Sequence, residues 1–405
     1  MIKRFLKGDT LSLILSLEGR GEKYGKNSQR KLLTESGKKR RKMNKRERVE
    51  RTMNFQETDR VPIYDLLRND AAFEYFSGEK LPVLSKDPET QEKLLKIAGK
   101  AVDKFCDMTR SVGFGPVVEE DIEDELGIVY HSSPMEKTTW VKKRPFNDEK
   151  GAIEFLKKWI MKVKKDRETI EKNPSEYRKK YHENFLKIQA VIGETVNLLA
   201  QHGTGLDEIR NILGLEIFSF VYCDDPGIIS EFLQEYTERN ITICHAVADK
   251  KLSPCVLTYG DIACKEKLLH SPDFLRKEFF PRLRKLNEAW HEHCFKCLFH
   301  SDGYLMDVMD DLIETGIDGL NPLETVAGMS IREVRQKYGY KIFLAGGIDI
   351  SQLLAFGTAE KVKEECRKAI REAGPGYFIG STTEIDNSAK LENIIALYEV
   401  IHLDG

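Results

Sequence analysis

Short apolar runs rich in β-forming residues alternate with longer segments of helical apolar spacing along most of this 405-residue chain. Segments such as 272–293 and 360–373 have the length and periodicity of helices. Strands that alternate with helices pair in parallel, and each helix is the crossover between two strands. Eight units predict a closed (β/α)8 TIM barrel rather than an open sheet. The predicted strands are 61–65, 104–108, 188–193, 254–261, 297–302, 317–321, 341–346 and 376–380.

One segment, residues 128–184, does not follow this alternation. It contains a hairpin pattern at 128–130 and 138–142, followed by highly charged helical sequence. We interpret it as an insertion between the second and third barrel strands that covers the mouth or mediates contacts. Its charged helices leave room for a homodimer.

The first 42 residues differ in charge from the rest of the chain. They hold 13 basic and four acidic residues, a net charge of +9, whereas the remainder carries −11. We interpret residues 1–42 as a poorly ordered, dispensable leader, in preference to a nucleic-acid or anionic-membrane patch at 38–42. The apolar run 11–17 is too short and too rich in serine for a signal sequence. We therefore expect the barrel domain to span 43–405, and Met43 to be a candidate natural start.

Composition limits the class of protein. A net charge of −2 argues against a general nucleic-acid binder. No apolar run reaches the length that a membrane span requires. Eight cysteines in so long a chain are not a disulfide framework, and we expect them reduced in the core. These features predict a cytoplasmic protein.

Polar side chains close almost every predicted strand. In a parallel barrel these ends meet at one rim, where barrel enzymes place their active sites. Helix capping explains any single one of them equally well, but for seven strand ends together we favour a site. We expect six of these residues to contact the substrate: Asp65, Arg68, Asp261, Asn321, Glu324 and Asp349.

The fifth strand carries the most specific pattern. Strand periodicity places His300 and Asp302 on one side, where they would ligate a metal or form an acid–base pair. The nearby run of His291, His293, Cys294 and Cys297 does not have zinc-finger spacing. We place its histidines at the opposite rim of the barrel.

Asp107 is a carboxylate within an apolar run. A buried charge requires a partner, and Arg68 is the candidate cation across the rim. A structural ion pair and a catalytic carboxylate both fit this pattern.

Several short motifs, in this order and spacing, resemble the uroporphyrinogen decarboxylase superfamily, from residue 43 to the C-terminus. They lie at 59–62, 299–303, 316–322, 345–349, 376–381 and 391–394. The superfamily includes cofactor-free decarboxylases of a tetrapyrrole and cobamide-dependent methyltransferases that use zinc. The resemblance implies the same barrel, with either chemistry at its rim.

The match to each chemistry is incomplete. The decarboxylases carry an Arg-Gln-Ala-Gly-Arg segment. Residues 66–72 stand at the matching position in this chain, and Arg68 is the only arginine among them. Asp107 resembles their catalytic acid. The methyltransferases carry a His-x-Cys zinc pair, and this chain has His300-Ser301-Asp302 at that position. They also carry a later cysteine ligand, and this chain has Thr382-Thr383 there. An oxygen-richer zinc site of His300, Asp302 and Glu384 suits a methoxy or methylamine donor.

Three functions follow from these observations. We favour a corrinoid-dependent methyltransferase, with the corrinoid on a separate protein because the chain has no Asp-x-His-x-x-Gly loop. The second is a decarboxylase of uroporphyrinogen or a smaller acid, with no cofactor, Asp107 as acid–base group and Arg68 as carboxylate anchor. The third is a barrel that binds a tetrapyrrole or a partner without catalysis. The carboxylates at so many strand ends weigh against the third, because unpaired buried charge is destabilising.

Overall fold

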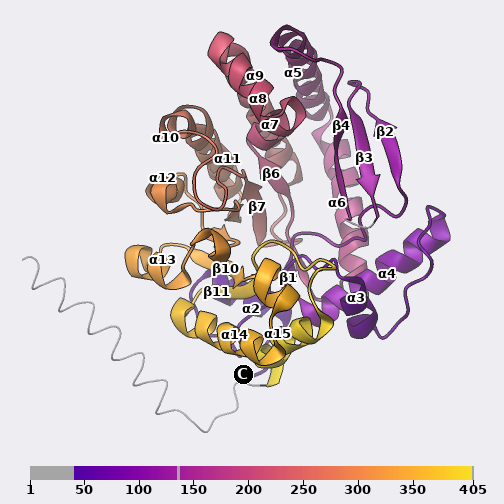
Figure 1. Cartoon of the computed structure of the whole chain (residues 1–405), viewed down its shortest axis with the longest axis vertical. Coiled ribbons are helices and arrows are strands. Elements are labelled where there is room, and N and C mark those ends of the chain that lie inside the picture. The colour runs from indigo at the N-terminus through magenta and orange to yellow at the C-terminus, as the bar shows by residue number, and fades with distance from the viewer. Residues whose placement is uncertain (1–40, 135–136, 404–405) are drawn as a thin grey trace, which may run out of the picture. The chain divides into compact units, whose positions relative to one another are not determined.

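The structure is a computed structural model that describes residues 41–134 and 137–403 (Figure 1). The expectations for residues 1–40 lie outside these ranges. Parallel strands form the centre of the molecule, and helices surround them (Figure 1). In chain order the barrel strands are the bridge residues Ile63 and Tyr64, β1 (Met108–Thr109), β5 (Val196–Asn197) continuing into β6 (Gln201–Gly203), β7 (Cys255–Tyr259), β8 (Lys296–His300), β9 (Gly319–Asn321), β10 (Phe343–Ile348) and β11 (Tyr377–Ser381).

Backbone hydrogen bonds close the strands into a ring. Tyr64 N donates to Ile379 O at 3.0 Å, and Met108 N donates to Ile63 O at 3.1 Å, so residues 63–64 join β11 to β1. The segment 196–203 pairs with β1 at its start and with β7 at its end. Each of the eight positions therefore has two parallel neighbours, and the predicted (β/α)8 barrel is confirmed.

Two of the eight predicted strands were misplaced. Residues 104–105 belong to the end of α4 (Pro88–Phe105), and the strand begins at Met108. Residues 188–191 belong to α6 (Pro174–Val191), and the strand begins at Val196. In both cases a helix continues to the edge of a very short strand, and a short apolar run does not distinguish the two.

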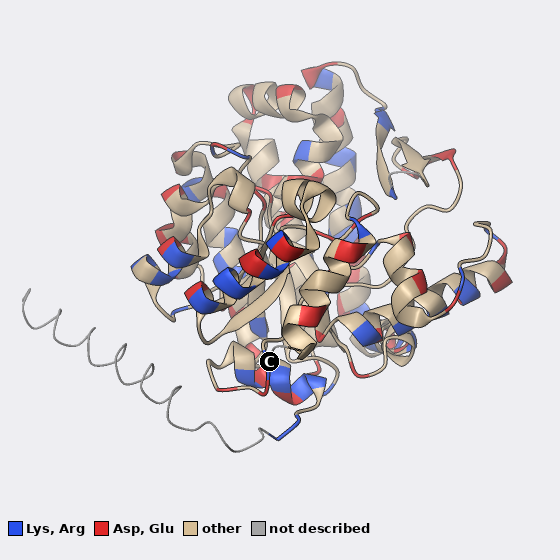
Figure 2. Cartoon of the chain, turned by 60° about the horizontal axis from the view of Figure 1, so that its bottom comes forward, with Lys and Arg blue, Asp and Glu red and all other residues tan. Residues whose placement is uncertain are grey.

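Helices and short turns connect the strands. In addition to α4 and α6 they are α2 (Lys45–Met53), α3 (Asp70–Ser77), α7 (Leu206–Leu213), α8 (Leu215–Asp224), α9 (Pro226–Val247), α10 (Pro272–Phe274), η1 (Leu275–Phe279), α11 (Phe280–Glu292), η2 (Met306–Val308), α12 (Met309–Glu314), η3 (Thr325–Ala327), α13 (Ile331–Tyr338), η4 (Ile350–Leu354), α14 (Ala359–Ala373) and α15 (Leu391–Leu403). Basic and acidic residues are interspersed on the outer helices in the view of Figure 2. No helix within 41–134 and 137–403 has the length and apolarity of a membrane span.

The chain between β1 and β5 contains a small sheet and two helices, and this segment begins before residue 128. After β1 the chain forms an antiparallel sheet of β2 (Glu120–Glu123), β3 (Val129–Ser133) and β4 (Thr138–Lys143). The hairpin of β3 and β4 matches the predicted one, and α5 (Glu149–Lys172) and α6 follow. Trp159 of α5 packs on Phe232 of α9 with ring centroids 4.4 Å apart. This contact fixes α5 against a barrel helix.

The barrel interior is filled by apolar side chains from many strands, among them Tyr64, Met108, Leu257, Leu298, Phe343 and Phe378. All eight cysteines are free, and five are buried as expected, whereas Cys223 and Cys294 are exposed and Cys264 is half-buried. The packed interior leaves the strand ends as the part of the barrel available for chemistry.

Asp318, directly before β9, connects β9 to α11 and to the start of β8 at the N-terminal end of the barrel. It accepts hydrogen bonds from His291 Nε2 at 2.8 Å, Lys296 Nζ at 2.7 Å and Cys297 N at 2.9 Å. Burial alone would raise the pKa of Asp318, but these donors outweigh it and lower the pKa below its usual value. Its ionised form is therefore stabilised by the fold.

We expect Asp318→Asn to reduce the free energy of unfolding at pH 7 by about 1.5–3 kcal/mol, the range for hydrogen bonds to a charged group. Because the folded pKa lies below the unfolded one, this stability is present above about pH 4 and is lost as the pH falls through the folded value. Urea unfolding should show a smaller difference in unfolding free energy between Asp318→Asn and wild type at pH 3 than at pH 7. Asp310→Asn, at an exposed aspartate, is the control. A stability difference between Asp318→Asn and wild type that is as large at pH 3 as at pH 7 would contradict the linkage.

Candidate functional site

Three side chains from two neighbouring strands converge at the C-terminal rim. His300 ends β8, Asp302 follows it, and Asp261 follows the end of β7. One ligand atom of each lies within 4.8 Å of the other two. The Nε2 atom of His300 and the Oδ1 atom of Asp302 are 4.0 Å apart. The pair predicted from strand periodicity is thus brought together, and Asp261 joins it.

Asn321, at the end of β9, fixes the orientation of His300. Its Nδ2 donates to the carbonyl of Ala345 at 3.2 Å, so its Oδ1 faces His300 Nδ1 at 2.7 Å. The imidazole therefore carries its proton on Nδ1 and presents the Nε2 lone pair to the carboxylates. Burial, together with the charge of Arg110, lowers the pKa of His300 to about 4. A neutral imidazole with a free Nε2 is the form that binds metals.

Asp302 provides a test of whether a cation fits this group. Burial, followed by repulsion from Asp261 and Glu324, raises the pKa of Asp302 to about 7. Its Oδ1 is buried without a hydrogen-bond partner among the described residues. A divalent cation between Asp261, His300 and Asp302 would satisfy this oxygen and offset the repulsion. One imidazole nitrogen and two carboxylates are a donor set that zinc accepts.

Asp207, at the start of α7, holds the backbone of Asp261 and was not predicted from the sequence. Both of its carboxylate oxygens accept from Asp261 N, at 3.1 and 2.9 Å, and Arg210 Nη2 lies 2.8 Å from Oδ1. Burial and then the charge of Asp261 raise the pKa of Asp207 to about 7. It follows the third strand, which the sequence analysis placed too early, so its position at a strand end was hidden.

Glu384 was expected as a metal ligand, but it does not belong to the group of three. Its carboxylate forms ion pairs with Arg68 Nη1 at 3.4 Å and Arg110 Nη2 at 3.9 Å. Asp261 therefore replaces Glu384 in the expected donor set. Arg110 follows β1 and was also missed, because that strand was placed too early. The positive charge of Arg110 helps to lower the pKa of His300, and it partly opposes the rise in the pKa of Asp302.

The remaining predicted residues act on the backbone around the site. Glu324 accepts from Gly303 N at 2.8 Å and so orders the loop after β8. Asp65 accepts from Ser381 N at 2.7 Å and Oγ at 2.8 Å, and burial raises its pKa to about 6. Asp349 accepts three backbone N–H groups at the start of η4. Helix capping, the alternative considered for every strand end, thus accounts for the contacts of Asp349.

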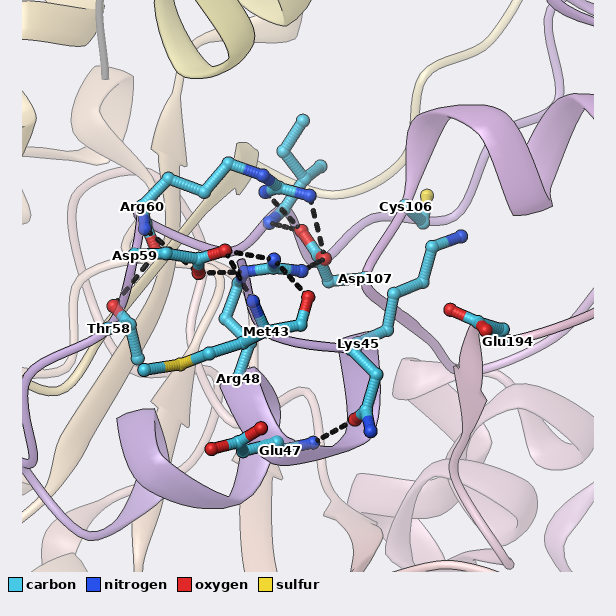
Figure 3. Close-up of polar contacts among 12 residues, drawn as sticks. Met43, Lys45, Glu47, Arg48, Thr58, Asp59, Arg60, Cys106, Asp107 and Glu194 are labelled. Carbon is cyan, nitrogen blue, oxygen red and sulfur yellow. Dashed lines mark hydrogen bonds and ion pairs between the residues drawn. The ribbon is translucent and has the colours of Figure 1, made fainter. Parts of the chain in front are cut away.

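Asp107 lies away from this rim, immediately before β1. Its carboxylate pairs with Arg48 Nη1 at 2.7 Å and Arg60 Nη1 at 2.6 Å (Figure 3), and it accepts from Ile63 N at 2.9 Å. Its side chain is 0% exposed. The expected pairing of Asp107 with Arg68 was wrong, because Arg68 pairs with Glu384. The carboxylate is enclosed by two arginines, and this geometry supports the structural ion pair rather than the catalytic carboxylate.

Comparisons with known proteins give one family match and two structural neighbours. A family model described as uroporphyrinogen decarboxylase (URO-D) matches residues 180–403. A methyltransferase from Methanosarcina mazei superposes with a TM-score of 0.61 at 16% identity, covering 89% of this chain and 98% of its own. A B12-independent methionine synthase from Shewanella sp. W3-18-1 gives a TM-score of 0.44 at 12% identity, covering 85% and 98%. No curated protein sequence matches the chain.

Proposed function

The chain belongs to the uroporphyrinogen decarboxylase family, and from this premise we propose that it is the methyl-donor component of a corrinoid-dependent methyltransferase. In this proposal a small methoxy or methylamine compound gives its methyl group to a corrinoid held by a separate protein. The observation that carries the proposal is the group of Asp261, His300 and Asp302, with a neutral imidazole and an unsatisfied carboxylate oxygen at the rim. Zinc is the proposed cofactor.

The reaction moves a methyl group, formally as CH3+, from the oxygen or nitrogen of the donor to cob(I)alamin. The donor atom keeps the bonding electron pair and then takes a proton. Bound at Asp261, His300 and Asp302, zinc would polarise that donor atom as a Lewis acid. Asn321 keeps His300 in the required tautomer, and Asp207 holds the backbone of Asp261.

Decarboxylation of uroporphyrinogen ranks second because two of its expected groups are engaged elsewhere. Asp107 is enclosed by Arg48 and Arg60, and Arg68 pairs with Glu384. A substrate with many carboxylates requires several cations, since an unpaired buried charge costs several kcal/mol. At the described strand ends of the rim, Arg68 and Arg110 are candidate cations, and both already pair with Glu384.

We expect the zinc-loaded full chain to convert cob(I)alamin, free or on a corrinoid protein, to methylcobalamin with at least one donor of a methoxy and methylamine panel. The measurement is the absorbance change of the corrinoid under anaerobic conditions, and reactions without donor are the control. A corrinoid spectrum unchanged across the panel, together with coproporphyrinogen formed from uroporphyrinogen, would replace the proposal with the decarboxylase.

A further inference from the structure

A second group of metal-ligating side chains lies away from the rim, where α9 and α11 end. Cys244 and His245 are in the last turn of α9, and His293 directly follows α11. One ligand atom of each lies within 4.8 Å of the other two. The Nδ1 atom of His245 and the Nε2 atom of His293 are 3.0 Å apart. The group therefore connects two barrel helices at their C-terminal ends.

Cys244 is the buried member of the group and lies in an apolar cluster with Leu286 and Trp290 of α11. A hydrogen bond between the two imidazoles accounts for their 3.0 Å separation but gives no role to Cys244. Among the buried cysteines of the described chain, the thiols of Cys106 and Cys297 each contact a backbone carbonyl, whereas those of Cys244 and Cys366 make no hydrogen bond. Cys244 is fully buried beside two histidines that are not. A thiol and two imidazole nitrogens form a compact set of soft donors.

We propose that Cys244, His245 and His293 bind a zinc ion that joins α9 to α11. In tetrahedral zinc sites with Zn–N distances of 2.0–2.1 Å, two nitrogens lie about 3.3 Å apart, close to the separation of the histidines. Binding replaces the thiol proton and requires both imidazoles to be neutral. The site is independent of the proposed function and of the rim group.

Charged neighbours are compatible with a cation there. Glu292 acts on both Cys244 and His293, and its negative charge favours a bound cation. Arg178 is the opposing positive charge, and it pairs with Asp249 at 3.6 Å and donates to the carbonyl of Ala248. Water or the Glu292 carboxylate is available for the fourth position.

Spacing along the chain does not reveal this group. His293 stands in a run with His291, Cys294 and Cys297, but His291 contacts Asp318 and Cys297 is part of the core. The partner His245 comes from 48 positions earlier. Only the packing of α9 against α11 brings them together.

Cobalt substitution separates this site from the rim. The rim group contains no sulfur, so a thiolate-to-cobalt charge-transfer absorption would come from Cys244 or from the group of His291, Cys297 and Asp318, and not from the rim. We expect metal-free full chain to develop this band with Co2+. Cys244→Ser should abolish it, and His300→Ala, Cys223→Ser and Cys294→Ser should keep it. A band that survives Cys244→Ser, or no band in the wild type, would overturn the proposal.

Zinc content gives a second test. We expect His245→Ala and His293→Ala each to lose one zinc per chain relative to wild type and to the remote control His131→Ala, with unchanged circular dichroism. If both variants retain the wild-type zinc content, the site does not exist. If zinc is lost in these variants but not in His300→Ala, the site stands and the metal of the proposed function fails.

Discussion

Replacing Asp107 by alanine is expected to lower the free energy of unfolding by about 3–5 kcal/mol, the cost of removing one partner from a buried ion pair. The reason is that Arg48 and Arg60 would keep their charges with no carboxylate between them, and Ile63 N would lose its acceptor. Arg48 retains Asp59 at 2.7 Å, which limits the loss on its side. Urea unfolding at neutral pH measures the change.

Asp103→Ala is the matched control, because Asp103 forms a half-exposed pair with Lys45 in the same part of the molecule. We expect it to cost no more than about 1 kcal/mol. Asp107→Asn keeps an acceptor for Ile63 N but removes the charge. Its loss of unfolding free energy should therefore lie between those of Asp107→Ala and Asp103→Ala. An Asp107→Asn protein with wild-type stability and no turnover would show that the carboxylate serves chemistry instead.

The position of Asp107 illustrates how a small error in a strand changes the interpretation of a site. A strand at 104–108 has Asp107 at its C-terminal end, on the catalytic rim. In the structure α4 runs to Phe105 and the strand begins at Met108, so Asp107 precedes the strand. The same shift hid Arg110, which follows the true strand, pairs with Glu384 and acts through its charge on His300 and Asp302.

Strands longer than three residues were easier to predict. The runs at 254–261, 297–302 and 376–380 correspond to β7, β8 and β11, and β8 carried His300 to the rim as expected. A strand of two residues between long helices, such as β1, has no periodicity of its own. The barrel and the His300–Asp302 pair were therefore predictable, whereas Asp207 and Arg110 were not.

Contacts between residues far apart in the chain were the second feature that the sequence could not predict. Sequence position gives no information on whether Glu384 faces a metal or the guanidinium of Arg68, 316 residues away. Nor does it distinguish Asp349, whose oxygens cap η4, from Asp261, whose oxygens remain at the rim. Both are aspartates after a barrel strand. Asp349 accepts three backbone N–H groups, whereas Asp261 accepts one, from Asp302 at 3.3 Å, and this difference separates a capping residue from a candidate ligand.

His300→Ala is expected to remove the rim metal and to reduce methyl transfer by at least about 100-fold. Loss of a residue that merely supports a metal ligand typically costs 10–100-fold in affinity or activity, and the ligand itself should cost no less. The measurements are zinc content and the rate of methylcobalamin formation with a donor that the wild type uses. The zinc proposed at Cys244 must be counted separately, with Cys244→Ser in the same background.

A graded series distinguishes a metal ligand from a residue that only maintains the fold. Asn321→Ala leaves His300 in place but removes the acceptor for its Nδ1–H, so metal affinity should weaken by about 10–100-fold. Asp349→Asn alters another carboxylate after a barrel strand, one that caps a helix, and should leave metal affinity unchanged. The order His300→Ala, Asn321→Ala, Asp349→Asn in decreasing effect follows from coordination through His300 Nε2. Equal loss in all three would mean that the rim collapses as a unit, and wild-type zinc and turnover in His300→Ala would exclude the imidazole from the reaction.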